Sequence, residues 1–211
     1  MKKLILLELA LLFLATTFQS DNPPGWYQQP LPLVDLINDV FFLDSLNGWI
    51  VTYSQSTTDT AYILKTDNGG KSWVVQFDTA INFNVVQFLD SLVGYVAGGD
   101  GRATILKTTN GGLEWQVSVP FGVNIYQITD LQFINKDTGW ICSDDLFGGG
   151  IFKTTNAGNN WIGQTTTSVN ARQIHFINKD TGWTSTGNAK IYRTNNGGTN
   201  WFWQMSFLRD L

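Results

Sequence analysis

The sequence of 211 residues is poor in the side chains that most often carry chemistry, with one histidine, His175, and one cysteine, Cys142. A single cysteine can neither form a disulfide within the chain nor build a zinc site, so we expect Cys142 to be a small buried residue of a strand. Catalysis with a histidine base would depend on His175 alone. That residue lies in an expected inner strand, where it would pack in the core or line a channel. No metal site and no cofactor are expected.

Charged residues are also scarce, at 14% of the chain, whereas about 25% is typical of soluble domains. The formal net charge is −4, from 13 Lys and Arg and 17 Asp and Glu. Proteins that bind nucleic acid neutralise phosphates with basic residues, so nucleic acid is not an expected partner. Aromatic residues make up 14% of the chain and glycine accounts for 21 residues, which excludes a disordered chain and favours strands joined by tight turns.

Residues 1–20 have the features of a signal peptide. Lys2 and Lys3 precede an apolar run from Leu4 to Phe18 that only Glu8 interrupts. This run is too short for a membrane span, which needs about 20 residues, and fits the core of a signal peptide. We therefore expect residues 21–211 to be secreted, periplasmic or on the cell surface, without a membrane span after cleavage. An uncleaved anchor or a true N-terminal helix is the alternative.

One motif, T-x-N-x-G-x-x-W, occurs four times, with its tryptophans 42, 46 and 40 residues apart. Two further landmarks precede each copy: an isoleucine two residues before a Lys or Arg, and a phenylalanine six residues before a Gly-aromatic pair. Their fixed order identifies a true repeat. The motif residues are Thr66, Asn68, Gly70 and Trp73; Thr108, Asn110, Gly112 and Trp115; Thr154, Asn156, Gly158 and Trp161; and Thr194, Asn196, Gly198 and Trp201.

Each repeat predicts four short strands joined by turns. The motif is expected to form the turn between the third and fourth strands, with a positive φ at its glycine, and with the asparagine side chain bonded to the backbone two residues on. A four-stranded sheet cannot bury both faces alone, but sheets stacked radially can, which predicts an all-β propeller of four-stranded antiparallel blades. The blades are expected at about 38–80, 84–120, 128–167 and 171–207, after a lone strand at 26–30.

The motif resembles the Asp-box, or bacterial neuraminidase repeat, whose consensus is S/T-x-D-x-G-x-x-W. The longer unit is more similar to propellers of the photosystem II assembly and stability factor-like family, and the likeness covers about Trp26 to Gln204. This resemblance implies an exported bacterial propeller whose Asp-box turns are structural and lie away from the ligand cleft. Asparagine replaces the Asp-box carboxylate in all four copies, which argues further against metal binding by these turns.

The strand count does not fit a closed ring of four blades, because the lone strand is one too many. We therefore interpret the sequence as the N-terminal part of a longer propeller. The alternative is a small four-bladed ring with an extra edge strand. A structure in which the fourth blade packs against the first would favour the ring, and an open arc would favour the longer propeller.

The Asp-box resemblance makes sialidases the enzymes to consider, and it implies a site with three arginines, a Tyr–Glu pair and an acid. The four arginines of this chain include Arg193, at the repeat position that lysine holds in the other units, and Arg209 in the C-terminal tail. The one glutamate after the signal segment, Glu114, lies in a turn. Adjacent Asp144 and Asp145 would point to opposite faces of a strand, so a paired-carboxylate glycosidase is also not expected.

The loops between the second and third strands, and the connection into the third unit, differ most between repeats. Specificity tends to lie in such loops, although neutral drift would give the same pattern. The candidate ligand-binding residues are Arg102, Tyr126, Asp144, Asp145, Phe147 and Arg172. We predict a non-catalytic scaffold that binds a protein or a glycan. The alternatives are an Asp-box glycoside hydrolase with its active site outside this sequence, and an assembly chaperone like the photosystem II stability factors, against which the acidic charge argues.

Overall fold

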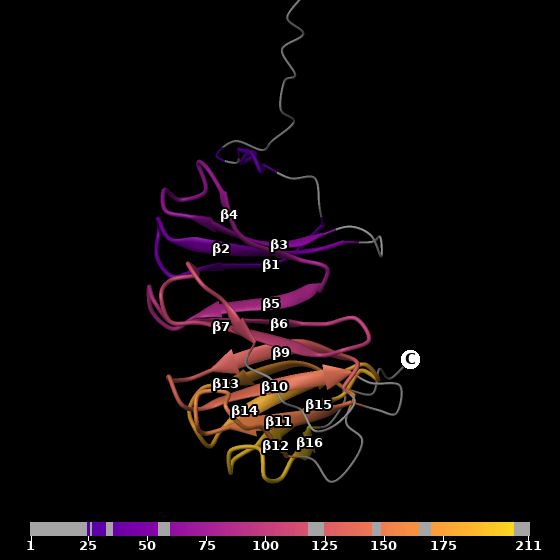
Figure 1. Ribbon diagram of the computed structural model, residues 1–211. Coiled ribbons are helices and arrows are strands. Elements are labelled where there is room, and N and C mark those ends of the chain that lie inside the picture. The colour runs from indigo at the N-terminus through magenta and orange to yellow at the C-terminus, as the bar shows by residue number, and fades with distance from the viewer. Residues whose placement is uncertain are drawn as a thin grey trace, which may run out of the picture.

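The computed structural model describes residues 25, 27–32, 36–54, 60–117, 125–144, 149–164 and 170–204. The predicted signal segment, Trp26 and the candidate residues Asp145 and Phe147 lie outside these ranges. The described residues form four four-stranded antiparallel sheets, each with its strands in sequence order (Figure 1). This confirms the predicted all-β fold. Within the same ranges, no helix has the length and apolar character to cross a membrane.

Each sheet is one blade. Blade 1 contains β1 (Leu36–Phe42), β2 (Gly48–Tyr53), β3 (Ala61–Thr66) and β4 (Val74–Thr79). Blade 2 contains β5 (Phe83–Phe88), β6 (Gly94–Gly98), β7 (Thr104–Thr108) and β8 (Gln116–Val117). Blade 3 contains β9 (Gln127–Phe133), β10 (Gly139–Asp144), β11 (Gly150–Thr154) and β12 (Ile162–Gly163). Blade 4 contains β13 (Ala171–Phe176), β14 (Gly182–Thr186), β15 (Ile191–Thr194) and β16 (Phe202–Gln204).

The spacing between the repeated phenylalanine and glycine follows from the pairing of the first two strands. Phe42 ends β1 directly opposite Gly48, which begins β2. The phenyl ring lies so close to this glycine that an added Cβ would meet ring carbons at 2.7 Å. The same arrangement recurs in the other three blades, so the glycine is required by close approach of the ring and not by its own φ.

Aromatic stacking joins each blade to the next. The aromatic residue that follows this glycine lies flat on the repeated phenylalanine of the following blade. The stacked pairs are Trp49 and Phe88 at 3.5 Å, Tyr95 and Phe133 at 3.9 Å, and Trp140 and Phe176 at 3.6 Å between ring centroids. The apolar side chains around these pairs form the core clusters between successive blades. The core of the protein therefore lies between the sheets, as a propeller requires.

The inner strands β1, β5, β9 and β13 contact one another in sequence order. A buried carboxylate bridges two of them: Asp130 in β9 accepts hydrogen bonds from the backbone N–H of Leu131 at 2.8 Å and from that of Ile174 in β13 at 2.7 Å. Asp39 in β1 makes the equivalent bond to Val86 in β5 at 2.9 Å. Blade order is thus fixed by polar contacts at the inner edge as well as by the apolar core.

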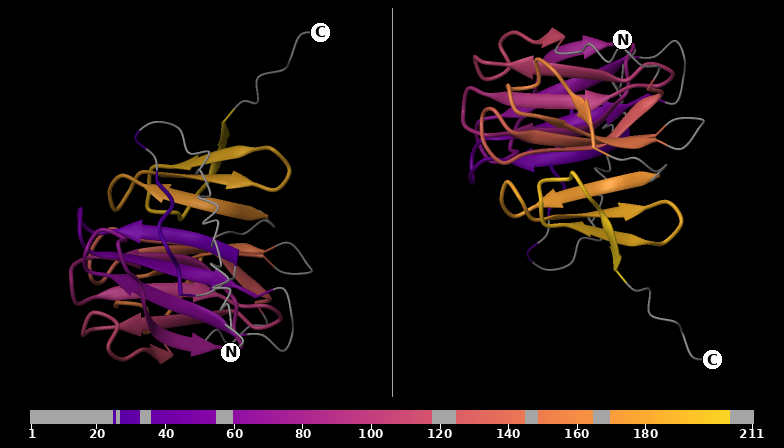
Figure 2. Two further views of the ribbon diagram at one scale, coloured as in Figure 1. Left: turned by 90° about the horizontal axis from the view of Figure 1, so that it is seen from above. Right: turned by 90° about the horizontal axis from the view of Figure 1, so that it is seen from below.

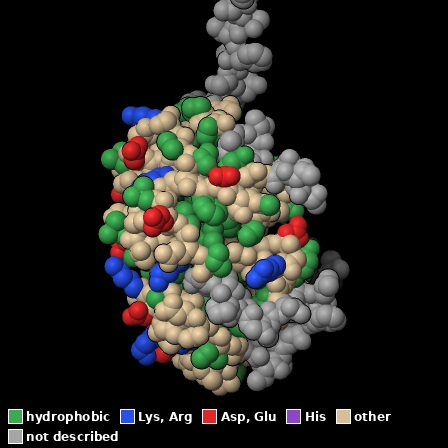
Figure 3. Space-filling model, in the orientation of Figure 1, with side chains coloured by type: hydrophobic (Ala, Val, Ile, Leu, Met, Phe, Trp, Pro, Cys, Tyr) green, Lys and Arg blue, Asp and Glu red, His purple; other side chains and the backbone are tan. Residues whose placement is uncertain are grey.

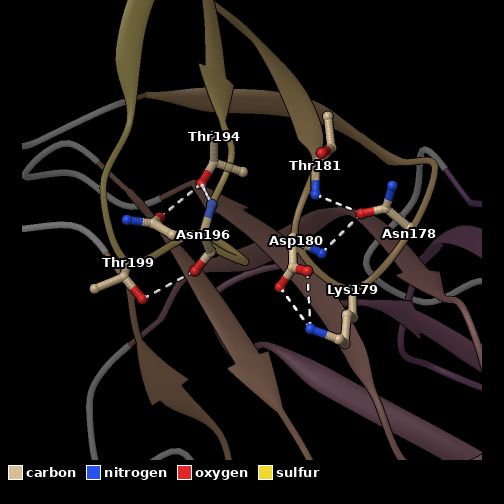
Figure 4. A network of polar contacts seen from close by, with 7 residues as sticks. All are labelled: Asn178, Lys179, Asp180, Thr181, Thr194, Asn196 and Thr199. Carbon is tan, nitrogen blue, oxygen red and sulfur yellow. Dashed lines mark hydrogen bonds and ion pairs between the residues drawn. The ribbon is translucent and has the colours of Figure 1, made fainter.

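The four tryptophan turns, by which we mean the T-x-N-x-G-x-x-W segments, share one set of hydrogen bonds. In the last copy, Thr194 Oγ1 donates to Asn196 Oδ1 (Figure 4). The same oxygen accepts from the backbone N–H of Gly198. Asn196 Oδ1 also accepts from the backbone N–H of Asn200, four residues on. The prediction that this asparagine bonds two residues on was wrong, because the turn is longer than an Asx-turn. The predicted positive φ at the motif glycines is confirmed.

The turn is also docked on the preceding turn of its own blade. Gly197 N donates to Asp180 O at 2.8 Å, and Asn178 Oδ1 caps the neighbouring turn by accepting from the backbone N–H of Asp180 and Thr181 (Figure 4). Trp201 lies edge-on to Phe176 at 5.9 Å, as the other motif tryptophans do to theirs. The motif residues are therefore structural parts of this end of each blade.

The lone strand expected at 26–30 is not formed over its described part, since Tyr27–Pro30 has no strand assignment. Pro30 and Pro32 lack the N–H groups that a ladder needs, which accounts for this correction. The segment nevertheless takes the place of a preceding fourth strand. Gln29 Nε2 donates to Gly69 O at 3.0 Å, just as Gln76 Nε2 from β4 donates to Gly111 O in the next blade.

Blade 1 and blade 4 do not close a ring in the described part of the chain. Figure 1 shows blade 1 at one end of the stack and blades 3 and 4 at the other, and the views of Figure 2 show the sheet of blade 4 (yellow) set off from the other three. The inner-strand contacts run from β1 to β5, from β5 to β9 and from β9 to β13. The structure is an open arc, which favours the longer propeller over the four-bladed ring.

Candidate functional site

The inner strands of the four blades begin at the same end of the molecule. Asn38 Nδ2 at the start of β1 donates to Phe83 O in β5, and Asn84 Nδ2 donates to Ile128 O in β9, both at 2.8 Å. Because each blade is an antiparallel meander, the loops between its second and third strands also lie at this end. We call this surface the loop rim. Its described side chains of interest are Tyr53, Asp100, Arg102, Tyr126, Asp144 and Arg172.

The first pair on the loop rim joins blade 2 to the connection into blade 3. Tyr126 donates its hydroxyl to Asp100 Oδ1 at 2.6 Å, and this bond raises the pKa of the tyrosine. Tyr53, at the end of β2, adds a smaller effect of the same sign on the tyrosine pKa. Tyr126 is 40% exposed and presents its ring at the surface. The pair is thus a fixed aromatic group beside an acid.

The second pair joins blade 3 to blade 4. Arg172 in β13 forms an ion pair with Asp144, the last residue of β10, at 3.2 Å. The arginine side chain is 48% exposed and the aspartate 20% exposed, so the guanidinium is the accessible half of the pair. Ser143 Oγ accepts from the backbone N–H of Gly150 at 3.0 Å, which pins the base of the loop that follows Asp144.

The structure places four of the six candidates on this rim, and the other two, Asp145 and Phe147, lie outside the described residues. Tyr126, Asp144 and Arg172 are held by specific partners. Arg102 is exposed in the neighbouring turn, and its side chain makes no ion pair with any described residue. Asp100 and Tyr53 were missed by sequence reasoning, and only the variable length of their loops could have indicated them.

Three further titratable groups of the described residues, Cys142, Asp130 and His175, do not come together as a catalytic set. Cys142 is fully buried in β10, as predicted, and burial raises the pKa of its thiol, so it remains protonated and unreactive. Desolvation raises the pKa of Asp130 to about 6, although its backbone hydrogen bonds oppose this. His175 lies in β13 as expected but is exposed, on the outer face of the last blade and not in a core.

The charged side chains of the described residues also build no metal centre, since no three His, Cys, Asp or Glu gather where an ion could sit. The repeats, the turn geometry and the arc of blades can now be compared with known proteins. The family model of photosynthesis system II assembly factor YCF48 matches residues 19–164. The chain belongs to this family. No curated protein is significantly similar in sequence.

Two natural proteins of known structure share the fold. A structure of YCF48 bound to D1 peptide superposes with a TM-score of 0.66 at 20% identity, covering 83% of this chain and 56% of that one. The GH74 enzyme of Niastella koreensis gives a TM-score of 0.62 at 16% identity, covering 79% of this chain and 30% of the enzyme. At these identities the likeness concerns the fold, and this chain spans little more than half of the YCF48 structure.

A designed protein is similar too. The computationally designed Ika4 protein gives a TM-score of 0.56 at 13% identity, covering 82% of this chain and 99% of its own. At 13% identity this likeness again concerns the fold alone.

Proposed function

We propose that this YCF48-family protein is a non-catalytic scaffold that binds a polypeptide partner through its loop rim. The observation that carries the proposal is the pairing of Tyr126 with Asp100 and of Arg172 with Asp144 at one end of the blades. Tyrosine and arginine are among the residues most often found as anchors in protein interfaces. Both are held by carboxylates, so little conformational entropy is lost when a partner binds.

Two further features support a protein partner. The YCF48 structure that shares this fold has a D1 peptide bound, so a relative takes a polypeptide. The surface shown in Figure 3 carries many hydrophobic side chains among few charged ones, which suits a partner with mixed apolar and polar groups. We extend the proposal to an exported chain on the basis of the signal-like residues 1–20.

Site-specific crosslinking tests the proposal. A photo-crosslinking amino acid is introduced in place of Tyr126 in the producing cell, and in a control in place of Leu113, which is exposed in a tryptophan turn at the opposite end. We expect a discrete protein adduct, identified by mass spectrometry, from position 126 and none from position 113. Adducts at neither position, or equal adducts at both, would contradict a partner at the rim.

A matched pair of charge removals sharpens the test. Arg172→Ala removes an ion-paired cation of the rim, whereas Lys179→Ala removes an ion-paired cation in the turn after β13, at the other end of the blade. We expect the first change to reduce the adduct from position 126 and the second to leave it unchanged. A glycoside hydrolase is the competing function. Turnover of a fluorogenic sialoside or of a polysaccharide that is lost in Arg172→Ala would replace the scaffold proposal with that one.

A further inference from the structure

Tyr126 and Asp100 lie where blade 2 meets the connection into blade 3, away from both ends of the arc. Ile125, next to the tyrosine, is buried, and its carbonyl oxygen accepts from the backbone N–H of Ala103 at 2.9 Å. This bond anchors the connection where it passes the turn after β6. The hydroxyl of Tyr126 donates to Asp100 Oδ1 at 2.6 Å. The backbone and the side chain of Tyr126 are therefore both held in place before a partner binds.

The carboxylate of Asp100 keeps an oxygen that is not used within the described part of the chain. The residue is exposed, and the hydroxyl of Tyr126 is the hydrogen-bond donor that the described residues supply to it. A carboxylate has about four sites that accept hydrogen bonds. The ion pairs of the described residues do not include Asp100, although Arg102 follows it in the same turn. Asp100 Oδ2 is thus available to a donor from outside.

The ring of Tyr126 lies next to this carboxylate and is 40% exposed. Gly101 supports one edge of the ring, since a Cβ added there would lie 3.9 Å from a ring carbon. Among the described residues, five other aromatic rings have a Lys or Arg over them, at 5.0–5.6 Å from the ring centroid, and Tyr126 is not one of these five. An open aromatic ring beside a free carboxylate oxygen is an arrangement that suits a cation.

We propose that Tyr126 and Asp100 bind a lysine or arginine side chain of the polypeptide partner, an inference that rests on the proposed function of the loop rim. The cation lies over the tyrosine ring and donates to Asp100 Oδ2, which combines a cation–π contact with a charge-assisted hydrogen bond. Because Asp100 Oδ1 is already bonded to the tyrosine hydroxyl, ring and carboxylate keep their relative position. A neutral side chain gains only the ring contact, and an anion is repelled.

Arg102, in the same turn, indicates a competing ligand, which is an acidic segment of the partner. The arginine is exposed, and its side chain forms no ion pair with a described residue. Ordering a free arginine side chain on binding costs conformational entropy, whereas Tyr126 and Asp100 are already held by each other. The fixed pair therefore favours the basic ligand, and recognition of an acidic one is an outcome of the test.

Titration of the purified chain with short synthetic peptides tests the inference. The probes have capped ends and consist of glycine and serine around one central arginine, lysine, norleucine or glutamate. Two-dimensional NMR follows the amide signals of Asp100, Gly101 and Tyr126. We expect the arginine and lysine probes to shift these signals in a saturable way at millimolar concentration, and their relative affinities show which cation fits better. Equal shifts with norleucine, shifts with glutamate alone, or no shift with either cation would overturn the proposal.

Substitutions assign the binding to the two groups. Asp100→Asn should weaken the cationic probes at least about tenfold, and Tyr126→Leu about two- to fivefold. The matched control is Asp67→Asn, which removes an exposed carboxylate from a tryptophan turn at the opposite end and should leave the affinity unchanged. Arg102→Ala should not weaken the cationic probes. Unchanged affinity in Asp100→Asn, or an equal loss in Asp67→Asn, would overturn the proposal, and the dispersion of the NMR signals checks that each variant is folded.

The crosslinking experiment at position 126 keeps this inference apart from the proposed function. We expect Asp100→Asn to reduce the adduct and Asp67→Asn to leave it unchanged. An adduct that persists undiminished in Asp100→Asn would retain the partner at the rim and overturn recognition of its basic side chain. If the unmodified rim gives no adduct at all, the proposed function fails, and the peptide titration alone then decides whether the pair binds a cation.

Discussion

Truncation of Trp140 is the most direct test of the statement that aromatic stacking holds successive blades together. This indole is fully buried, stacks on Phe176 of the next blade at 3.6 Å, and donates its Nε1–H to Gly197 O at 3.0 Å. Trp183 occupies the same repeat position in blade 4, without a following blade among the described residues. Trp140→Ala and Trp183→Ala therefore make the same chemical change with and without a neighbour.

The expected costs differ several-fold. A buried indole removes about 200 Å² of mostly apolar surface from water, which at about 25 cal/mol per Å² corresponds to about 5 kcal/mol. Trp-to-Ala changes in cores cost about 3–5 kcal/mol, and the lost hydrogen bond to Gly197 falls within that range. We expect about 4 kcal/mol for Trp140→Ala. Trp183 is partly buried and has the cation of Arg193 over its ring, but no aromatic ring of the described residues stacks on it, so we expect about 1 kcal/mol for Trp183→Ala.

Urea unfolding followed by circular dichroism measures the free energy of unfolding of both variants. The midpoint and the slope are fitted separately, because a change in slope would signal that one blade unfolds before the others. Equal costs for the two substitutions would refute the reasoning, since the neighbouring blade would then contribute nothing. A cost below about 1 kcal/mol for Trp140→Ala would refute it as well.

Three further results are expected. Asn156→Ala should lower the free energy of unfolding by about 1–2 kcal/mol, because the backbone N–H of Asn160 loses its acceptor. Asn156→Asp keeps an acceptor and should change the free energy of unfolding little. Urea unfolding compares the two variants. Ala157→Gly should raise the free energy of unfolding by about 0.5–1 kcal/mol, because Ala157 has a φ of 60°, which glycine adopts more easily, and the other three turns have glycine at this position. Thermal melts measure the gain in stability. Asp130 has a pKa of about 6 in the folded protein, above its ordinary 3.8, so the folded state binds this proton more tightly than the unfolded state does. The free energy of unfolding should therefore fall by about 2 kcal/mol as the pH rises from 4 to 7. Asp130→Asn should abolish this part of the pH dependence, and an unchanged pH profile would contradict the prediction.

The turns and the fold follow from the sequence because they depend on local contacts. The hydrogen bonds that shape this turn join Thr154, Asn156 and Gly158 with one another and with Asn160, a few positions away. Their spacing is therefore fixed by the chain itself and can be recognised without knowing the neighbours. The sequence analysis assigned the wrong hydrogen-bond donor to the asparagine side chain. The same residue pattern is compatible with two turns of different length, which only their hydrogen bonds distinguish.

The contacts between blades were less accessible to sequence reasoning. Nothing in the spacing of Trp49 and Phe88 states that they stack, because that contact depends on how two sheets of different repeats face each other. The loop rim was predicted only in outline for the same reason. Arg172 and Asp144 come from different blades. Tyr126 and Asp100 are hydrogen-bonded across a connection whose length varies between repeats. Such pairs depend on the placement of sheets and not on the pattern within one repeat.

The division between local and inter-blade contacts bears on where function can lie. Side chains at the turn end and between the sheets repeat in every blade because each is required by folding, so they cannot distinguish one blade from another. The loop rim is where the repeats differ, and Tyr126 and Arg172 stand there with carboxylate partners that no other described blade reproduces. We therefore expect a partner to be recognised at the rim, through Tyr126 and Arg172.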